Sequence, residues 1–94
     1  MELKDTIEMM QSADYKERFI AEYQQTKIRY EKLKTFNNKI EAAQRTQGDP
    51  FAPQKIEEPI HDCPAGILRE QQSAMGQYLH ILEVRAVIEG IKLP

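Results

Sequence analysis

The chain has a single cysteine, no tryptophan and no long run of apolar residues. Because Cys63 has no second cysteine to pair with, the fold forms without an internal disulfide, as is usual in a reducing compartment. No window has the apolar length that a bilayer span requires, and the N-terminal segment MELKDTIEMM lacks the basic and apolar regions of a secretion signal. We therefore expect a cytoplasmic protein that does not enter membranes.

The residue patterns of an enzyme are also missing. His61-Asp62-Cys63 contains a nucleophile and a base, but adjacent residues point in different directions, and Cys63 is better explained as the N-cap of a helix. His61, Cys63 and His80 do not have the spacing of a common zinc site. There is no Gly-rich phosphate loop and no basic recognition helix. The sequence therefore predicts no catalysis, no metal and no cofactor.

The 94 residues, 40% hydrophobic and 30% charged, indicate one small globular domain over residues 1–94. A core of this size is thin, so a helical hairpin gains stability by oligomerising. Residues 27–45 carry six Lys or Arg and two Asp or Glu, whereas both flanking segments are acidic. This basic segment either attracts an anion or pairs with acidic flanks, and the pI near 5.7 argues against duplex DNA as the partner.

The strongest pattern lies between Pro64 and Glu89 and predicts a long helix. Pro64 suits the first turn, with Cys63 as N-cap, and Gly90 is the matching stop. Two neighbouring apolar stripes follow helical spacing. The first contains Leu68, Met75, Leu79, Leu82 and Ala86, and the second contains Ile67, Ala74, Tyr78, Ile81 and Ile88. One partner helix cannot cover both stripes.

Gln71, Tyr78 and Arg85 form a polar line, each seven residues from the next, beside the second stripe. Two interpretations remain open. The three residues either edge a helix–helix interface, with Arg85 paired to a carboxylate, or face a ligand.

A second long helix is predicted over residues 13–44, because residues 14–43 contain neither Gly nor Pro. Its heptad seam consists of Phe19, Tyr23, Thr26, Tyr30, Leu33, Asn37 and Ile40. A polar line on the same helix consists of Arg18, Glu22, Gln25 and Arg29. This line is either a solvated face, with an Arg18–Glu22 pair, or a binding site.

The remaining segments are shorter. Asp5 and Glu8 have the spacing of a capping box, which predicts a short helix over residues 5–11, and Ser12 is a candidate N-cap for the helix that follows. The loop 46–62 is interrupted by Gly and Pro and is either a functional lid or a spacer, with Phe51, Ile56 and Ile60 as possible apolar anchors. The tail 91–94 either docks on a neighbouring subunit or frays.

Together these patterns predict an all-α fold. It is an antiparallel hairpin of two long helices, at residues 13–44 and 64–89, with a short N-terminal helix. We expect it to assemble with copies of itself into a homo-oligomeric bundle.

Two runs carry a family resemblance, YKERFIAEYQQTKIRYEKLKTF at residues 15–36 and CPAGILREQQSAMGQYLHILEVRAVIEGI at residues 63–91. They resemble a family of small proteins from phages and prophages of Gram-positive bacteria that is named after a protein of a crAss-like phage. The resemblance does not extend to the loop 46–62, and it implies a phage origin but no activity. The architecture is also similar to phage helical-hairpin proteins that sequester the cyclic-nucleotide signals of bacterial immunity.

The second similarity implies a phage-encoded anti-defence protein that binds a cyclic nucleotide or an ADP-ribose-type signal without turning it over. Such a site needs cations for phosphate, aromatic rings for bases and polar groups for base edges. The candidate ligand-binding residues are Tyr15, Arg18, Arg29, Gln71, Tyr78 and Arg85. The alternative is a small helical interaction module that uses its spare apolar stripe to bind or inhibit a host or phage protein.

Overall fold

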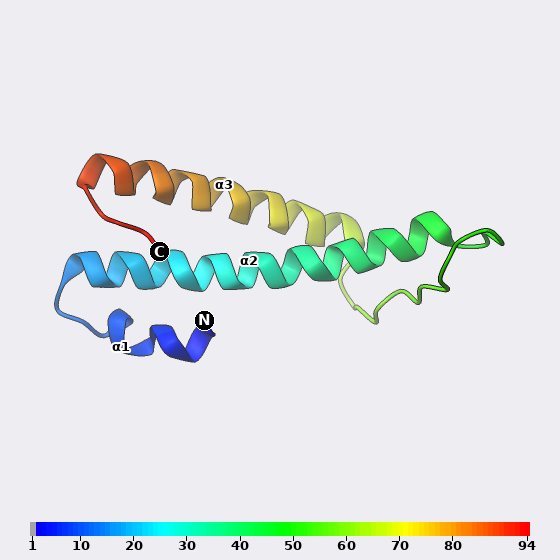
Figure 1. The fold of residues 1–94 in the computed structure, drawn as a ribbon, viewed down its shortest axis with the longest axis horizontal. Helices are drawn as coiled ribbons and strands as arrows, with labels where there is room; N and C mark the ends of the chain where they lie inside the picture. Colours follow the sequence, from blue (N-terminus) through cyan, green and yellow to red (C-terminus); the bar gives the residue numbers. More distant parts are fainter. Residues whose placement is uncertain (1) are drawn as a thin grey trace.

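The computed structural model describes residues 2–94, and its regular elements in that range are all helical. A short 3₁₀ helix, η1 (Leu3–Thr6), leads into α1 (Ile7–Met10), and two long helices follow, α2 (Tyr15–Thr46) and α3 (Ala65–Glu89). α3 runs antiparallel to α2, while η1 and α1 lie on the other side of α2 (Figure 1). The all-α hairpin is therefore confirmed, and assembly into a homo-oligomer stays a prediction.

The N-terminal helix begins earlier than expected. Glu2 and Asp5 form the capping box, in which the Glu2 N–H donates to Asp5 Oδ2 at 2.8 Å. The proposed box of Asp5 and Glu8 was wrong because Asp5 is used one turn earlier. Thr6 is fully buried, and its hydroxyl accepts a hydrogen bond from Gln25 Nε2 at 2.9 Å. This contact fixes the short helix to α2.

Asp14, and not Ser12, caps α2. Its carboxylate accepts a hydrogen bond from the Lys16 N–H at 2.9 Å and so satisfies one of the free amides of the first turn. The Ser12 hydroxyl instead accepts from the Asp14 N–H at 3.0 Å, which shapes the turn before the helix.

The two ends of α3 differ in how well the sequence predicted them. Pro64 itself is the N-cap, because its ψ of 140° is extended and its carbonyl accepts from the N–H groups of Ile67 and Leu68. Cys63 lies one residue too early, so its assignment as N-cap was wrong. The predicted stop is confirmed, since Gly90 has the left-handed φ of 70° that favours glycine at this position.

The core lies between α2 and α3. It consists of Phe19, Tyr23, Leu79, Leu82, Ala86 and Ile91. The first stripe of α3 and the predicted seam of α2 therefore face each other. Gly76 permits close approach, because a Cβ there would lie 3.2 Å from the Tyr30 ring. Ile91 is buried against its own hairpin, so the tail neither frays there nor waits for a neighbouring subunit.

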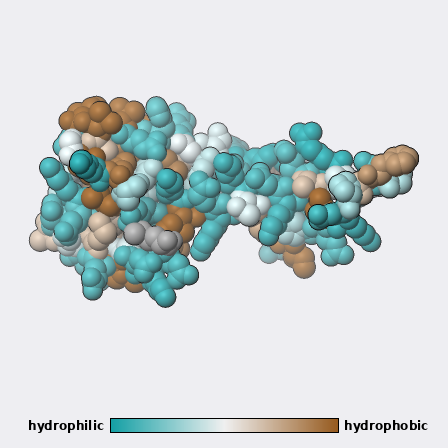
Figure 2. All heavy atoms as spheres, viewed as in Figure 1, coloured by the Kyte–Doolittle hydropathy of each residue, from teal (hydrophilic) through white to brown (hydrophobic). Residues whose placement is uncertain are grey.

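Other apolar side chains remain uncovered in the single chain. The second stripe of α3 is exposed, with 54% of Ile67, 48% of Ile81 and 77% of Ile88 accessible. Figure 2 shows hydrophobic side chains gathered at the end of the molecule where α3 ends. Phe51 and Ile60 are also almost fully exposed, so the expectation that they anchor the loop was wrong.

Replacing Leu82 with Ala should lower the free energy of unfolding by about 2–5 kcal/mol, because the side chain is 1% exposed and its loss leaves a cavity between the two long helices. Urea denaturation followed by circular dichroism measures the change. Ile60→Ala is the control, and we expect less than about 0.5 kcal/mol from this exposed position. Equal effects of the two substitutions would contradict the proposed core.

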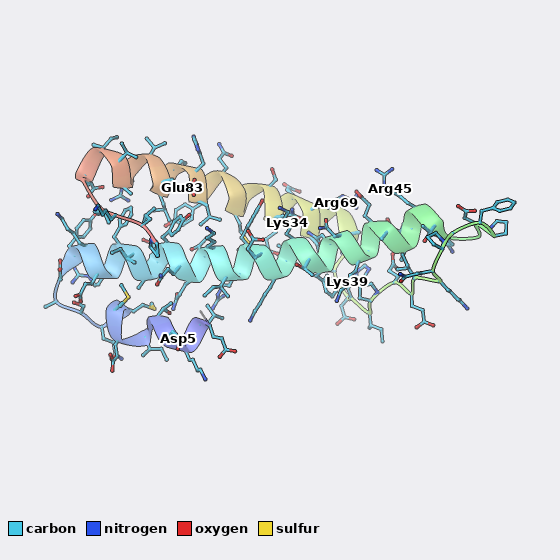
Figure 3. The ribbon with its side chains drawn as sticks, viewed as in Figure 1. Asp5, Lys34, Lys39, Arg45, Arg69 and Glu83 are labelled. Atoms are coloured by element: carbon cyan, nitrogen blue, oxygen red, sulfur yellow. The ribbon has the colours of Figure 1, made fainter. Side chains whose placement is uncertain are left out.

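A polar contact crosses one side of this core. The Tyr23 hydroxyl donates to Glu83 Oε2 at 2.6 Å, and Figure 3 shows Glu83 on the side of α3 that faces α2. Burial, followed by the hydrogen bond to the Glu83 carboxylate, raises the pKa of Tyr23 from 10.0 to about 12. The fold therefore favours the neutral phenol.

This shift makes stability fall in alkaline solution. Below pH 10 the Tyr23 phenol is neutral in both states, so its full contribution is present, and between pH 10 and about 12 the unfolded chain loses the proton first. The free energy of unfolding should then fall by about 1.4 kcal/mol per pH unit from this group. Denaturation curves measured from pH 9 to 12 should show a shallower fall for Tyr23→Phe than for the wild type. Parallel curves for the two proteins would refute the shift.

Candidate functional site

The predicted polar lines of α2 and α3 meet on one side of the hairpin, which we call the arginine flank. Its members are Tyr15, Arg18, Glu22, Arg29, Tyr78, Arg85 and Glu89. At the end of the hairpin away from the loop, Arg85 Nη2 donates to the Tyr15 hydroxyl at 2.5 Å. Arg85 Nε pairs with Glu89 Oε2 at 3.2 Å, and the Tyr15 hydroxyl donates to Glu89 Oε1 at 3.0 Å.

The Arg85 guanidinium also lies over an aromatic ring. Its central carbon is 5.0 Å from the centroid of Phe19, within the range of a cation–π interaction. The expected carboxylate partner of Arg85 is therefore Glu89, one turn further along the same helix. The ring and the carboxylate hold the guanidinium in one orientation.

Two turns closer to the loop, Tyr78 of α3 donates a hydrogen bond to Glu22 of α2. The hydrogen bond to the carboxylate, with burial next, raises the pKa of the Tyr78 phenol above its usual 10.0. Tyr15 behaves similarly, because its hydrogen bond to Glu89 raises its pKa. Both phenols therefore stay protonated at neutral pH and remain able to donate.

Arg18 and Arg29 line a groove of about 550 Å³ on the arginine flank. Met10 contributes from the short helix, and the remaining lining residues, Glu22, Gln25 and Thr26, come from α2. Arg18 Nη1 donates to the Ser12 carbonyl at 2.8 Å, so the predicted Arg18–Glu22 pair is wrong. Glu22 is instead held by the Tyr78 hydroxyl. Arg29 has no ion pair within residues 2–94 and is available to an anion.

Gln71 stays apart from the other five predicted residues. It is exposed on α3, and seven residues of helix place it roughly 10 Å along the axis from Tyr78. The structure thus brings together Tyr15 with Arg85, and Tyr78 with the groove of Arg18 and Arg29. Glu22 and Glu89, which connect these groups, were not among the six candidate ligand-binding residues, although Glu22 belongs to the predicted polar line of α2.

A second groove, of about 480 Å³, lies between α2 and α3 beside Tyr30 and Arg69. Asn37 Nδ2 donates to the Leu68 carbonyl at 3.1 Å and to Gln72 Oε1 at 2.9 Å. Its Oδ1 is buried and has no hydrogen-bond partner among the described residues. The sequence marked Asn37 only as a polar position in the seam. Its hydrogen-bond partners, Leu68 and Gln72, lie 31 and 35 positions further along the chain, so no local sequence pattern reveals these contacts.

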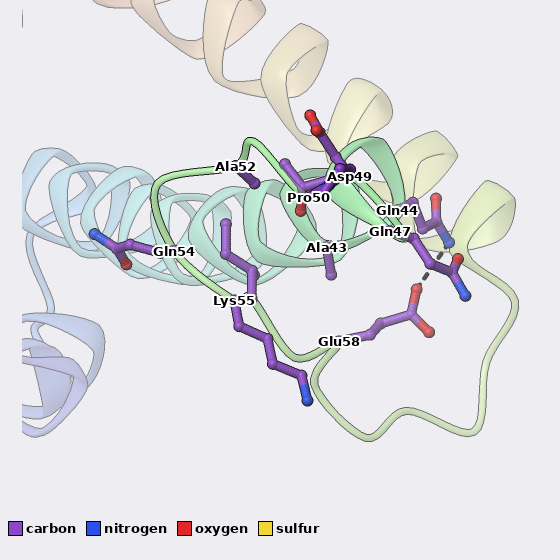
Figure 4. Close-up of a pocket in the computed structure, with 12 residues that line it drawn as sticks. Ala43, Gln44, Gln47, Asp49, Pro50, Ala52, Gln54, Lys55 and Glu58 are labelled. Atoms are coloured by element: carbon purple, nitrogen blue, oxygen red, sulfur yellow. Dashed lines mark hydrogen bonds between the residues drawn. The ribbon is translucent and has the colours of Figure 1, made fainter.

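The loop encloses a third cavity, of about 580 Å³, over the end of α2. Figure 4 shows Gln44 and Glu58 on its wall, joined by a hydrogen bond of 2.8 Å, with Lys55 across from them. The lining residues include no aromatic side chain and a single basic one. This cavity therefore lacks the groups that would hold a base and several phosphates.

The basic residues of 27–45 do not gather into one patch. Figure 3 shows Lys39 and Arg45 on different sides of α2. At 100° per residue, basic positions 27, 29, 32 and 34 also point in several directions. The positive charge of this segment is consequently a property of the chain and not of a single binding surface.

The donor set of the arginine flank suits binding. Three arginines offer hydrogen bonds to an anion, and two carboxylates can accept them from hydroxyl or amino groups. The Tyr15 and Tyr78 hydroxyls already donate their single proton to Glu89 and Glu22, so these residues offer their rings. Within residues 2–94, no group of three or more His, Cys, Asp or Glu is placed to hold a metal ion. In the same residues, none of the helices combines the length and the apolar character of a membrane span.

A helical hairpin with a polar, arginine-bearing flank is, by class, a small helical binding protein. The Sequestin family matches residues 13–88, which include α2 and nearly all of α3, and the chain belongs to this family. The name of the family denotes the sequestration of a ligand, and it points to binding rather than to catalysis. No curated protein and no solved structure matches the chain.

Replacing Glu22 with Gln should lower the pKa of Tyr78 toward 10.0, because the carboxylate that accepts its hydrogen bond is the main cause of the raised value. Ultraviolet titration of tyrosinate, compared with Tyr78→Phe to assign the signal, measures the change. Glu83→Gln is the matched control, since it should affect Tyr23 and leave Tyr78 unchanged. A Tyr78 titration unaltered by Glu22→Gln would show that this contact does not form.

Proposed function

We propose that the protein binds a cyclic nucleotide or an ADP-ribose-type signal on the arginine flank and withholds it without chemical change. The observation that carries this proposal is the meeting of Tyr15 with Arg85, and of Tyr78 with the groove of Arg18 and Arg29. Aromatic rings, guanidinium groups and carboxylates together are the groups that recognise bases, phosphates and sugar hydroxyls.

The arginines retain donors for phosphate. A guanidinium carries five N–H donors, and Arg85 uses one in its contact with Glu89 and one in its contact with Tyr15. Arg18 uses one in its hydrogen bond to the Ser12 carbonyl. A phosphate can therefore be bound without breaking these contacts, which keep the side chains in place before the ligand arrives. Such preorganisation reduces the entropy lost on binding.

The two carboxylates set a condition on the ligand. Glu22 and Glu89 lie beside the arginines, so an anion with charge alone, such as inorganic phosphate, is partly repelled. A ligand that also carries hydroxyl or amino donors can donate to the carboxylate lone pairs that the contacts with Tyr78, Tyr15 and Arg85 leave free. This requirement favours a nucleotide with free sugar hydroxyls or base amino groups over a simple anion.

The biological setting that we propose is a phage-encoded protein that counters bacterial immune signalling from within the host cytoplasm. Its support is the resemblance of residues 15–36 and 63–91 to phage and prophage proteins, together with membership of a family named for sequestration. A sequestering protein works by stoichiometry, so a small chain made in many copies and assembled with itself suits the task.

Isothermal titration with a panel of cyclic dinucleotides, cyclic trinucleotides and ADP-ribose-type signals tests the proposal. We expect at least one ligand to bind, and Arg85→Ala to weaken it roughly 10- to 150-fold, the loss of a charged hydrogen bond worth about 1.5–3 kcal/mol. Arg45→Ala is the matched control, because Arg45 is exposed near the loop and pairs with Glu41, one turn away on the same helix. Mass spectrometry of the released ligand should show it unchanged.

Absence of binding heat across the whole panel would refute the proposal. Because Arg85 also holds Glu89 and Tyr15, the melting temperature and the assembly mass of Arg85→Ala are measured together with its affinity. A loss of stability without a loss of affinity would make Arg85 structural. If the released ligand is hydrolysed, the protein is an enzyme, and the proposal of sequestration without chemical change is wrong.

A further inference from the structure

The outer face of α3 carries a second seam that no part of residues 2–94 covers. Its residues follow steps of three and four along the helix, the spacing of a heptad repeat. They are Ile67, Glu70, Ala74, Gln77, Ile81, Val84 and Ile88. All seven are exposed. Ridges of this spacing pack best against another helix with the same spacing.

The outer seam lies away from the buried face of the same helix. At 100° per residue, Ile81 points roughly 100–160° from Leu79, Leu82 and Ala86, which contact α2. The hairpin partner therefore cannot reach the outer seam. Ile81, Val84 and Ile88 are 48%, 44% and 77% exposed, and Figure 2 shows hydrophobic side chains on the surface at the end of the molecule where α3 ends.

We infer that the outer seam is occupied by α3 of a second copy of this chain, packed antiparallel. In a parallel pair Glu70 would meet its own counterpart inside the seam, and two like charges would be brought together. In an antiparallel pair that overlays the whole seam, Ile67 lies level with Ile88 of the second copy. Glu70 then lies level with Arg85 of the second copy, so opposite charges meet.

Steric fit supports the same direction. The antiparallel overlay sets the small Ala74 opposite the large Ile81 of the second copy, whereas a parallel pair sets Ile81 against Ile81 and Ala74 against Ala74. Alternating small and large side chains fill the space between helices without gaps. Arg85 also keeps N–H donors beyond those given to Glu89 and Tyr15, so a second carboxylate can be accommodated.

This arrangement has a consequence for the arginine flank, and only this consequence depends on the proposed function. The midpoint of residues 67–88 lies next to Tyr78, so the two Tyr78 side chains come to either side of the two-fold axis. Gln71, Tyr78 and Arg85 border the seam, and antiparallel packing places this border beside the same border of the second copy. The ligand-binding flanks of the two copies would thus be neighbours.

Disulfide trapping tests whether the two α3 helices pack antiparallel. In a Cys63→Ser background, Ile67→Cys and Ile88→Cys are prepared as separate single variants, one of them with a mass tag. Mild oxidation of the mixture should give the tagged–untagged disulfide as the main product, while each variant alone remains largely uncrosslinked. Self-crosslinking of either single variant would establish a parallel pair and overturn the inference.

Light scattering tests whether the outer seam is the surface through which two copies associate. The wild type should have twice the 11.0 kDa mass of one chain, or an even multiple of it, and Ile81→Glu should halve that mass. Ile60→Glu is the control, since Ile60 is 97% exposed in the loop and should leave the mass unchanged. Circular dichroism should show equal helicity in all three proteins. A wild-type monomer, or an Ile81→Glu protein with wild-type mass, would overturn the inference.

These measurements need no ligand, so they are separable from the nucleotide proposal. A trapped antiparallel pair without any binding heat would uphold the interface and reject the nucleotide. Binding heat from a monomeric protein would uphold the nucleotide proposal and reject the interface.

Discussion

The apolar contact between Leu82 of α3 and the aromatic pair Phe19 and Tyr23 of α2 is the interaction on which the rest of the structure depends. It fixes the rotation of α3 about its axis, and this rotation decides which polar residues border α2. Glu83 is turned to one side and Tyr78 to the other. A helix of the same composition with its apolar stripe displaced by one residue would separate all of these partners.

α2 differs from α3 because it is covered on two sides. The short N-terminal helix packs against it through Thr6 and Gln25, and α3 packs on the opposite side. The arginine flank lies between these two contacts, and its groove is lined by residues of α2 and by Met10 of α1. Among the helices of residues 2–94, α3 packs against α2 alone, which leaves its outer face free for association with another protein chain.

The helices were predictable because their signals are local: the 3–4 apolar spacing, the Gly- and Pro-free stretch and Gly90. The caps were harder to predict. Asp14 lies two residues after Ser12 and is an equally good N-cap, whereas Glu2 and Pro64 are not among the residue types by which an N-cap is recognised in a sequence. The site was predictable only in part. Arg85 and Tyr78 were found from their spacing, and Glu89 lies four residues after Arg85 on the same helix, a local spacing that could have identified it. Glu22, which holds Tyr78, is defined by the register between two helices, which a single sequence does not state.

One end of the hairpin is closed by the chain itself, and the other has no covalent link. At that open end, the contacts of Tyr15, Arg85 and Glu89 fasten the first turn of α2 to the last turn of α3. These contacts hold the two helix ends together. Any molecule that competes for these groups loosens the ends of both helices, and any molecule that bridges them draws the ends together, so occupancy of this position and the rigidity of the hairpin are thermodynamically linked.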